Sequence, residues 1–206
     1  MALSTNRKLS NKGEPSLNSL NKEYEGKENR CFAAEVIETK DNFKSPERIV
    51  EKIISQPEEY TLENFDTKME DITRFRIVCN YLSDIFVLME RLKADSGLKS
   101  CCKISDEKDY IVKHCTRSHR AVHLILKVPM QDKTRKVELQ IMTQLQHAWD
   151  KKDHNLIYEK RRIGEKIDEK DKIKMAAMSD LLYVADEFFD DLRKKILKKR
   201  NRRNKL

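Results

Sequence analysis

Two segments in the middle of the chain alternate apolar with polar residues, and this pattern limits the possible folds more than any other feature. Apolar residues recur at every second position within residues 119–129 and 136–142, at Val122, Leu124, Leu126, Val137, Leu139 and Ile141. Because the side chains of a strand point alternately to its two faces, each segment is predicted to be a β-strand with one face in the core. The opposite faces carry histidine, glutamate and glutamine, which they present to solvent or to a ligand.

Other helices and strands are predicted on both sides of this pair. Ser45 and Pro46 predict the start of a helix, as its N-cap and its first residue. A short β-branched strand is predicted at residues 76–81, followed by a helix capped by Ser83, and a weaker strand is predicted near residues 101–104. This order predicts an α/β fold of the α+β sandwich type, with a mixed sheet of about five strands flanked by helices.

We expect three parts in the 206 residues. Residues 1–30 are polar and hold few apolar side chains, so they are predicted to form a flexible arm. Residues 31–165 are assigned to the folded domain, and residues 166–206 to a long amphipathic helix that ends in a basic tail. The apolar stripe of this helix is formed by Leu181, Leu182, Ala185, Phe188, Phe189, Leu192 and Ile196. The stripe either packs back on the monomer or joins copies of the chain, and we favour a homo-oligomer.

The charge of the chain indicates polyanionic partners. A formal net charge of +8 at pH 7 favours nucleotides or RNA, although the charge could also lie mostly in a solvated tail. The five cysteines are odd in number and form no C-x-x-C pair, which fits reduced thiols and not a disulfide framework or a zinc site. No apolar run approaches the ~18 residues of a membrane span, and the N-terminus lacks an apolar signal segment. We therefore expect a cytoplasmic protein with no membrane partner.

Asp71 comes shortly before the strand that begins at Arg76, and Arg74 lies between them. A carboxylate at the edge of a strand can hold Mg²⁺, and arginines beside it can bind phosphate oxygens. The alternative is a surface ion pair ahead of a core strand. The chain has only four glycines and no glycine-rich phosphate loop. Lysine and arginine side chains would therefore have to hold any bound phosphate.

Glu138 and Gln140 share one face of the second alternating strand. They could serve as a metal ligand or general base and as a group that reads a nucleobase, or simply form the polar face of an antiparallel strand. His119 and His123 are predicted to share a face of the first alternating strand. On a strand they would lie about 13 Å apart, too far to bind one metal ion, which favours hydrogen bonds to a phosphate or ribose.

Six segments of the chain, taken in order, resemble motifs of the RelA/SpoT synthetase domain. They are Phe43-Lys44-Ser45-Pro46-Glu47, the run from Asp71 to Ile85, Lys108-Asp109-Tyr110-Ile111, the run from Ser118 to Leu124, Glu138-Leu139-Gln140-Ile141-Met142-Thr143, and Trp149 with Asp153, His154 and Tyr158. The resemblance implies a nucleotidyltransferase-like fold. It also implies an ATP:GTP 3′-diphosphotransferase, an enzyme that transfers pyrophosphate from ATP to the 3′-hydroxyl of GDP or GTP.

The resemblance further implies a role for each candidate site residue. Asp71 and Glu138 would be the catalytic residues, which bind Mg²⁺, and Glu138 would share the metal or activate the acceptor hydroxyl. The ATP phosphates would be held by Lys44, Lys52, Arg74 and Arg76. The acceptor nucleotide would be bound by Lys113, His119, His123 and Gln140.

Several positions depart from the family pattern. Asn42, Arg74, His119 and Met142 stand where the family has an arginine, a glycine, a stacking tyrosine and an arginine. Two alternatives therefore stay open: the acceptor could be the 3′ end of tRNA, which the basic tail would contact, or the chain could be a catalytically degenerate regulator that binds nucleotide or RNA. No separate hydrolase domain is predicted, so we expect the chain to make its product without degrading it.

Overall fold

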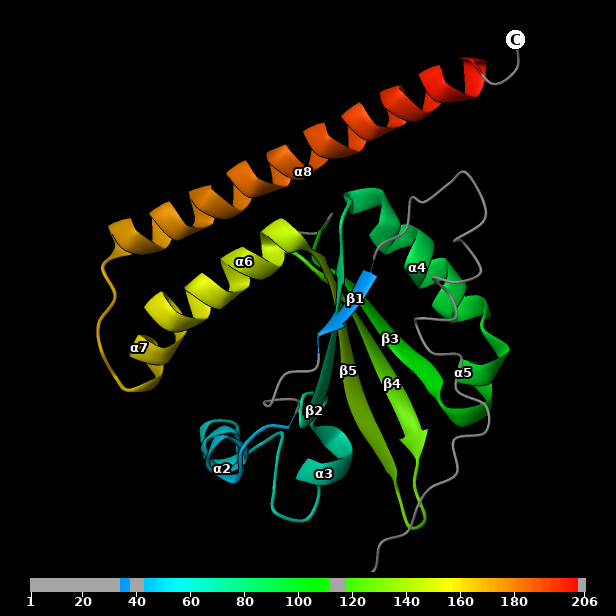
Figure 1. Cartoon of the computed structure of the whole chain (residues 1–206). Helices are drawn as coiled ribbons and strands as arrows, with labels where there is room; N and C mark the ends of the chain where they lie inside the picture. The colour runs from blue at the N-terminus through cyan, green and yellow to red at the C-terminus, as the bar shows by residue number, and fades with distance from the viewer. Residues whose placement is uncertain (1–33, 38–42, 112–117, 204–206) are drawn as a thin grey trace, which may run out of the picture.

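A computed structural model describes residues 34–37, 43–111 and 118–203 of the chain (Figure 1). The predicted arm at residues 1–30 lies outside these ranges, and so do the candidate site residue Lys113 and the departure Asn42. Within the described residues, no helix is both long enough and apolar enough to cross a membrane.

The central feature is a five-stranded mixed sheet, with the strand order β1-β2-β5-β4-β3. The strands are β1 (Ala34–Ile37), β2 (Thr73–Cys79), β3 (Lys103–Asp109), β4 (Val122–Pro129) and β5 (Thr134–Thr143). Strands β2 and β5 run parallel, and the other neighbouring pairs are antiparallel. The prediction of a mixed sheet of about five strands flanked by helices is confirmed.

The helices lie around this sheet (Figure 1). They are α2 (Pro46–Ser55), α3 (Phe65–Lys68), α4 (Leu82–Ala94), α5 (Ser96–Cys101), α6 (Gln144–Asp153), the π-helix η1 (His154–Tyr158), α7 (Glu159–Arg162) and α8 (Glu169–Arg203). In Figure 1, α8 runs alongside α6 at one end of the sheet, whereas α2 and α3 lie toward the other end.

One of the two predicted helix caps is correct. The Ser45 side chain accepts a hydrogen bond from the backbone amide of Arg48, and Pro46 is the first residue of α2. Ser83, however, is not the cap of α4, since that helix begins at Leu82. The Ser83 hydroxyl instead donates to Asp190 of α8 at 2.5 Å. The Ser83 hydroxyl, which the local sequence predicted to cap the helix, therefore makes a tertiary contact with a carboxylate instead.

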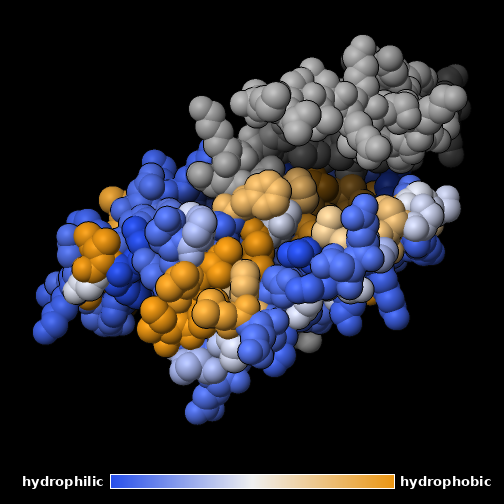
Figure 2. Space-filling model, turned by 90° about the horizontal axis from the view of Figure 1, so that it is seen from below, coloured by the Kyte–Doolittle hydropathy of each residue, from blue (hydrophilic) through white to orange (hydrophobic). Residues whose placement is uncertain are grey.

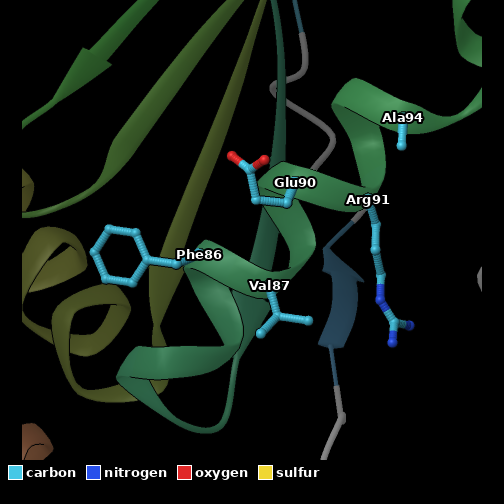
Figure 3. Close-up of a pocket in the computed structure, with 5 residues that line it drawn as sticks. All are labelled: Phe86, Val87, Glu90, Arg91 and Ala94. Atoms are coloured by element: carbon cyan, nitrogen blue, oxygen red, sulfur yellow. The ribbon is translucent and has the colours of Figure 1, made fainter.

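The main core lies between one face of the sheet and α4. It contains alternate residues of β2, β4 and β5 and the inward side of the helix: Ile77, Leu124, Leu126, Leu139, Ile141, Ile85, Leu88 and Met89. A pocket on α4 is lined by Phe86, Val87, Glu90, Arg91 and Ala94 (Figure 3). None of the predicted site residues lines this pocket.

Helix α8 contacts the domain through apolar residues such as Met175, which packs with Trp149, and through polar residues. Ser179, Asp186 and Asp190 are buried, and the Thr143 hydroxyl at the end of β5 donates to Asp186 at 2.6 Å. Large apolar side chains of the same helix are exposed: Leu181, Val184, Phe188, Phe189, Leu192 and Ile196. The predicted apolar stripe is therefore mostly unburied in the single chain. On the surface seen from below in Figure 2, hydrophobic residues gather in the middle of the face and hydrophilic residues surround them.

Candidate active site

Strand register brings the predicted site residues together on the face of the sheet opposite α4. In the parallel pair of β2 and β5, Arg74 lies beside Glu138 and Arg76 beside Gln140. In the antiparallel pair of β4 and β5, His123 lies beside Gln140. Because neighbours in register project to the same side of a sheet, residues up to 66 positions apart form one polar surface.

Asp71 lies in the turn just before β2, where two lysines bind it. Lys44 Nζ lies 2.6 Å from Asp71 Oδ2, and Lys52 Nζ, from α2, lies 2.9 Å from Oδ1. Burial raises the pKa of Asp71, but the two lysines outweigh it and hold the pKa below its usual value. Burial lowers the pKa of Lys44 against the pull of Asp71. Asp71 is thus an ionised carboxylate, and its two lysine partners are cations that could also bind a phosphate.

Glu138 lies among its polar partners at the centre of β5, with its side chain 13% exposed. Its Oε1 lies 2.9 Å from His123 Nδ1, and its Oε2 accepts a hydrogen bond from Gln140 Nε2 at 2.8 Å. Burial raises the pKa of Glu138, but the hydrogen bond and charge of His123, together with Gln140, bring it below its usual value. Glu138 is therefore held as a carboxylate, the form that can bind a metal or accept a proton.

His119 does not occupy the position predicted for it. It precedes β4, which begins only at Val122, and it follows Ser118, whose φ is 58°. This left-handed residue turns the chain, and His119 Nε2 comes within 2.9 Å of His123 Nε2. The expected separation of about 13 Å, which assumed one continuous strand, is wrong.

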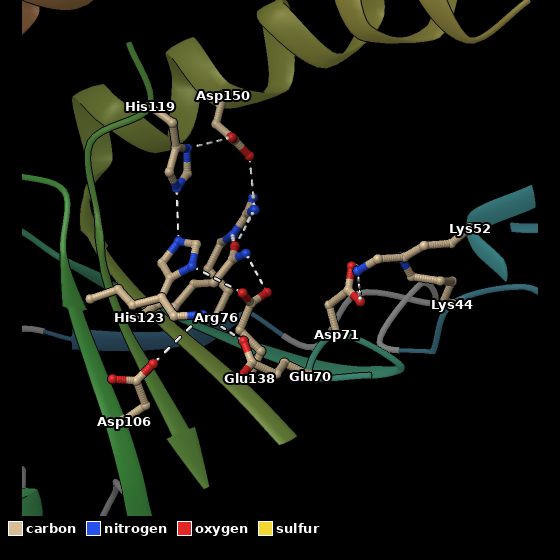
Figure 4. A network of polar contacts seen from close by, with 12 residues as sticks. Lys44, Lys52, Glu70, Asp71, Arg76, Asp106, His119, His123, Glu138 and Asp150 are labelled. Carbon is tan, nitrogen blue, oxygen red and sulfur yellow. Dashed lines mark hydrogen bonds and ion pairs between the residues drawn. The ribbon is translucent and has the colours of Figure 1, made fainter. Parts of the chain in front are cut away.

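A closed ring of hydrogen bonds joins the two histidines to helix α6 (Figure 4). His119 Nδ1 lies 3.0 Å from Asp150 Oδ1, and Arg76 Nη2 donates to Asp150 Oδ2 at 2.8 Å. Arg76 also donates to Gln140 Oε1, which returns the ring to Glu138. Burial raises the pKa of Asp150, but its bonds to His119 and Arg76 hold it far below the usual range.

The donor set of this face fits a magnesium ion shared with phosphates. The negative charge of Asp71 raises the pKa of Glu138, so the two carboxylates are close enough to interact electrostatically. Figure 4 draws both residues in the same polar network. Among the described residues, no three His, Cys, Asp or Glu side chains form a metal-binding cluster. Two carboxylates without a third ligand are typical of Mg²⁺ sites in which substrate phosphates complete the coordination.

Several polar residues of this face escaped the sequence analysis. Asp150 and His147 come from α6, and His147 Nδ1 lies 3.1 Å from Arg76 Nη1. Glu70, next to Asp71, binds Lys108 and Lys136. His147 and Asp150 are three residues apart and therefore share one side of a helix. That spacing was a usable signal, but only the tertiary structure shows that this side faces the sheet.

Residues 41–163, more than half of the chain, match the family described as the region found in RelA / SpoT proteins. The chain is 32% identical over 124 residues to the GTP pyrophosphokinase YwaC of Bacillus subtilis, and 30% identical over 129 residues to the GTP pyrophosphokinase YjbM of the same organism. These alignments cover 58% and 61% of this chain. They cover 57% and 58% of the relatives, so the chain spans little more than half the length of the curated relatives it matches.

Solved structures share the fold. The crystal structure of the small alarmone synthetase 1 from Bacillus subtilis bound to its product pppGpp has a TM-score of 0.70 at 25% identity, covering 87% of this chain and 88% of that one. A GTP pyrophosphokinase family protein from Streptococcus pneumoniae has a TM-score of 0.70 at 20% identity, covering 89% of this chain and 86% of that one. Since the matched segment contains β2 to β5 and both carboxylates, the chain belongs to the RelA/SpoT family.

Proposed function

We propose that this protein transfers pyrophosphate from ATP to the 3′-hydroxyl of GDP or GTP, which yields (p)ppGpp and AMP. The observation that carries the proposal is the position of Glu138, an ionised and largely buried carboxylate, within electrostatic reach of Asp71 and its two lysines. The names of the two curated relatives and of the product-bound structure support the same reaction.

The reaction needs an acceptor oxygen, a proton acceptor and charge neutralisation. The 3′-oxygen attacks the β-phosphorus of ATP, the bond from that phosphorus to the oxygen bridging the α-phosphate breaks, and AMP leaves. Glu138 accepts the hydroxyl proton. Phosphoryl-type transfer depends mostly on positioning and electrostatic stabilisation, so cationic side chains carry much of the catalysis.

Four cations are assigned to ATP: Lys44, Lys52, Arg74 and Arg76. Lys44 and Lys52 would exchange part of their contact with Asp71 for phosphate oxygens. Arg74 lies close enough to Lys44 for its charge to lower the pKa of that lysine. Arg76 bonds Gln140 and Asp150 in the free chain, so its assignment requires these contacts to loosen when ATP binds.

Mg²⁺ would be held by Asp71 and Glu138 and would neutralise charge on the ATP phosphates. His119, His123 and Gln140 are assigned to the acceptor nucleotide, and Lys113 is assigned to it from the family resemblance alone. We place the reaction in the cytoplasm, where ATP and guanine nucleotides are available and thiols stay reduced.

An acceptor panel tests this function. Purified full-length protein is incubated with Mg²⁺, ATP labelled in its β-phosphate, and one acceptor at a time: GMP, GDP, GTP or deacylated tRNA. We expect a labelled 3′-pyrophosphorylated nucleotide with GDP or GTP. If only tRNA became labelled, the acceptor would be tRNA and not a guanine nucleotide. Nucleotide binding without a labelled product in any reaction would contradict enzyme activity.

We also propose that copies of the chain associate through α8. The exposed side chains Leu181, Val184, Phe188, Leu192 and Ile196 recur at intervals of three or four residues and so form one stripe. An apolar stripe of this length is typical of an interaction surface.

We further propose that the chain is divided into an arm at residues 1–30, a domain at residues 31–165 and a helical tail at residues 166–206. RNA is proposed as a further partner of the basic end of this tail.

A further inference from the structure

The turn at Ser118 determines where His119 lies, and its backbone has a conformation that few residues adopt. Ser118 has a φ of 58°, in the left-handed region. Glycine takes this conformation without steric cost, whereas a residue with a Cβ pays free energy for it. Such a conformation persists where the surrounding structure holds it. Contacts from elsewhere in the fold should therefore hold this turn.

Helix α8 makes such a contact with the turn. The Ser179 hydroxyl donates a hydrogen bond to the carbonyl oxygen of Ser118 at 2.6 Å, and Ser179 is completely buried. The side chain of Gln146, from α6, donates to the carbonyl oxygen of Ser179 at 3.4 Å. The bond thus lies where the turn, α6 and α8 meet, and water does not reach the position of the Ser179 hydroxyl.

Arg120, the residue after His119, is bound to the same helix. Its side chain is 4% exposed, and its Nη2 donates to Asp180 Oδ1 at 2.6 Å. Its guanidinium carbon lies 4.3 Å from the centre of the Tyr183 ring. Its Nη1 donates to the carbonyl oxygen of Ile111 at 3.1 Å. Helix α8 therefore holds the chain on both sides of His119.

We propose that Ser179 is a positioning residue for the acceptor nucleotide, because its bond to Ser118 holds the turn that brings His119 into the acceptor site. This inference rests on the proposed function, which assigns His119 to the acceptor. His119 Nδ1 lies 3.0 Å from Asp150 Oδ1, and its Nε2 lies 2.9 Å from His123 Nε2 (Figure 4). Without the Ser179 bond the turn relaxes, and His119 leaves these two partners.

Ser179→Ala removes the hydroxyl and changes the size of the side chain little. The KM for GDP or GTP should rise by about 2–10-fold, the effect of one lost hydrogen bond. The KM for ATP should change much less, because Lys44 and Lys52 bind Asp71 ahead of β2 and do not contact the turn. Ser179→Cys keeps a weak donor and should give a smaller rise in the acceptor KM.

Ser118→Gly distinguishes a positioning role from general damage to the fold. Glycine adopts a positive φ without strain, so the turn then needs the Ser179 bond less. The double variant Ser118→Gly with Ser179→Ala should bring the acceptor KM most of the way back to the wild-type value. A KM as high in the double variant as in a folded Ser179→Ala protein would overturn the proposal.

Ser83→Ala is the matched control. The Ser83 hydroxyl also bonds α8, at Asp190, but it does not contact the turn. This variant loses a contact with the same helix, yet its KM values for ATP and for the acceptor should equal those of the wild type. An acceptor KM raised as much as in Ser179→Ala would show that loosened docking of α8 is the cause, and it would overturn the proposal.

The position of His119 can also be measured without nucleotide, so this test does not depend on synthetase activity. Nuclear magnetic resonance of isotope-labelled histidine rings, assigned with His119→Ala, should show the His119 signals shifted in Ser179→Ala and unchanged in Ser83→Ala. The double variant with Ser118→Gly should return them toward the wild-type values. Thermal unfolding checks that each variant is folded.

The two tests separate the two proposals. Unchanged His119 signals in a folded Ser179→Ala protein would overturn the role of Ser179. Shifted signals in a protein that makes no product with any acceptor would overturn the proposed function, while supporting the inference that α8 holds His119 through the turn at Ser118.

Discussion

The two faces of the central sheet are made from alternate residues of the same strands, yet they are stabilised in different ways. On one face, Leu124, Leu139 and Ile141 pack under α4 and are almost completely buried. On the other, Glu138 and Gln140 of the same β5 belong to a ring of hydrogen bonds. Apolar contacts are nondirectional and tolerate many partners, whereas each polar contact needs a particular atom at a particular place.

This difference predicts that changes on one face should affect stability and changes on the other should affect chemistry. The apolar face gains free energy from removing surface from water. The polar face gives little net stability, since its groups also lose hydrogen bonds to water, but it holds ionised groups in fixed positions. The following variants test this separation.

Glu138→Gln gives the largest expected effect. It removes the proposed proton acceptor and one charge of the metal site while keeping the size of the side chain. We expect product formation to fall by about 10²–10⁴-fold, the usual contribution of a general base. The rate is measured with labelled ATP and GDP, and the unfolding midpoint should move little. An active Glu138→Gln enzyme would contradict the role assigned to this residue.

Leu124→Ala makes the matched change on the opposite face. Leu124 is completely buried in the core beneath α4, so its truncation should cost about 2–5 kcal/mol of unfolding free energy. Chemical denaturation measures this loss. At a temperature where the variant is still folded, its specific activity should stay close to that of the wild type. A loss of activity as large as that of Glu138→Gln would remove the distinction between the faces.

Asp186 is an acid buried against Thr143, at the end of β5. Burial raises its pKa to about 6 from 3.8, because burial disfavours the charged form. Between these two values the unfolded chain releases the proton first, so stability falls as the pH rises from about 4 to about 6 and then levels off. The total change should be about 3 kcal/mol.

Asp186→Asn should remove this pH dependence, because the amide does not ionise. The unfolding free energies of the wild type and the variant should therefore diverge between pH 4 and 7, with the variant gaining relative to the wild type. Asp191→Asn, a change at an exposed acid of the same helix, should leave the wild-type curve unchanged. Parallel curves for the wild type and Asp186→Asn would show that Asp186 is ionised throughout.

Phe188→Ser tests the outer side of α8, where apolar groups face solvent. Phe188 is 71% exposed. Burial of such a side chain between copies is worth about 1.5–3 kcal/mol, so the variant should self-associate about 10–100-fold more weakly. Sedimentation equilibrium measures this change, and Leu62→Ser, at an equally exposed apolar residue away from α8, is the control. A wild-type protein that stays monomeric at all concentrations would contradict association through α8.

The strands, the sheet type and the candidate carboxylates could be predicted because they depend on local patterns. A period of two specifies a strand whatever lies beside it, and Asp71 and Glu138 stand in motifs whose order is visible in the chain. The position of His119 could not be predicted in this way. It depends on the turn at Ser118, a non-glycine residue with positive φ that no nearby residue type signals.

Sequence alone thus determined which residues alternate and which helices are amphipathic, since these properties repeat along the chain at the period of a strand or a helix. It also determined which family the motifs resemble, since their order is visible in the chain. Only the tertiary structure decided that Asp150 of α6 would reach His119, that Ser83 would bind Asp190, and that α8 would turn Asp186 and Asp190 inward and most of its apolar stripe outward. The physical reason is that these contacts join residues 31 and 107 positions apart. Such contacts stabilise the protein only after the sheet and the helices have packed together.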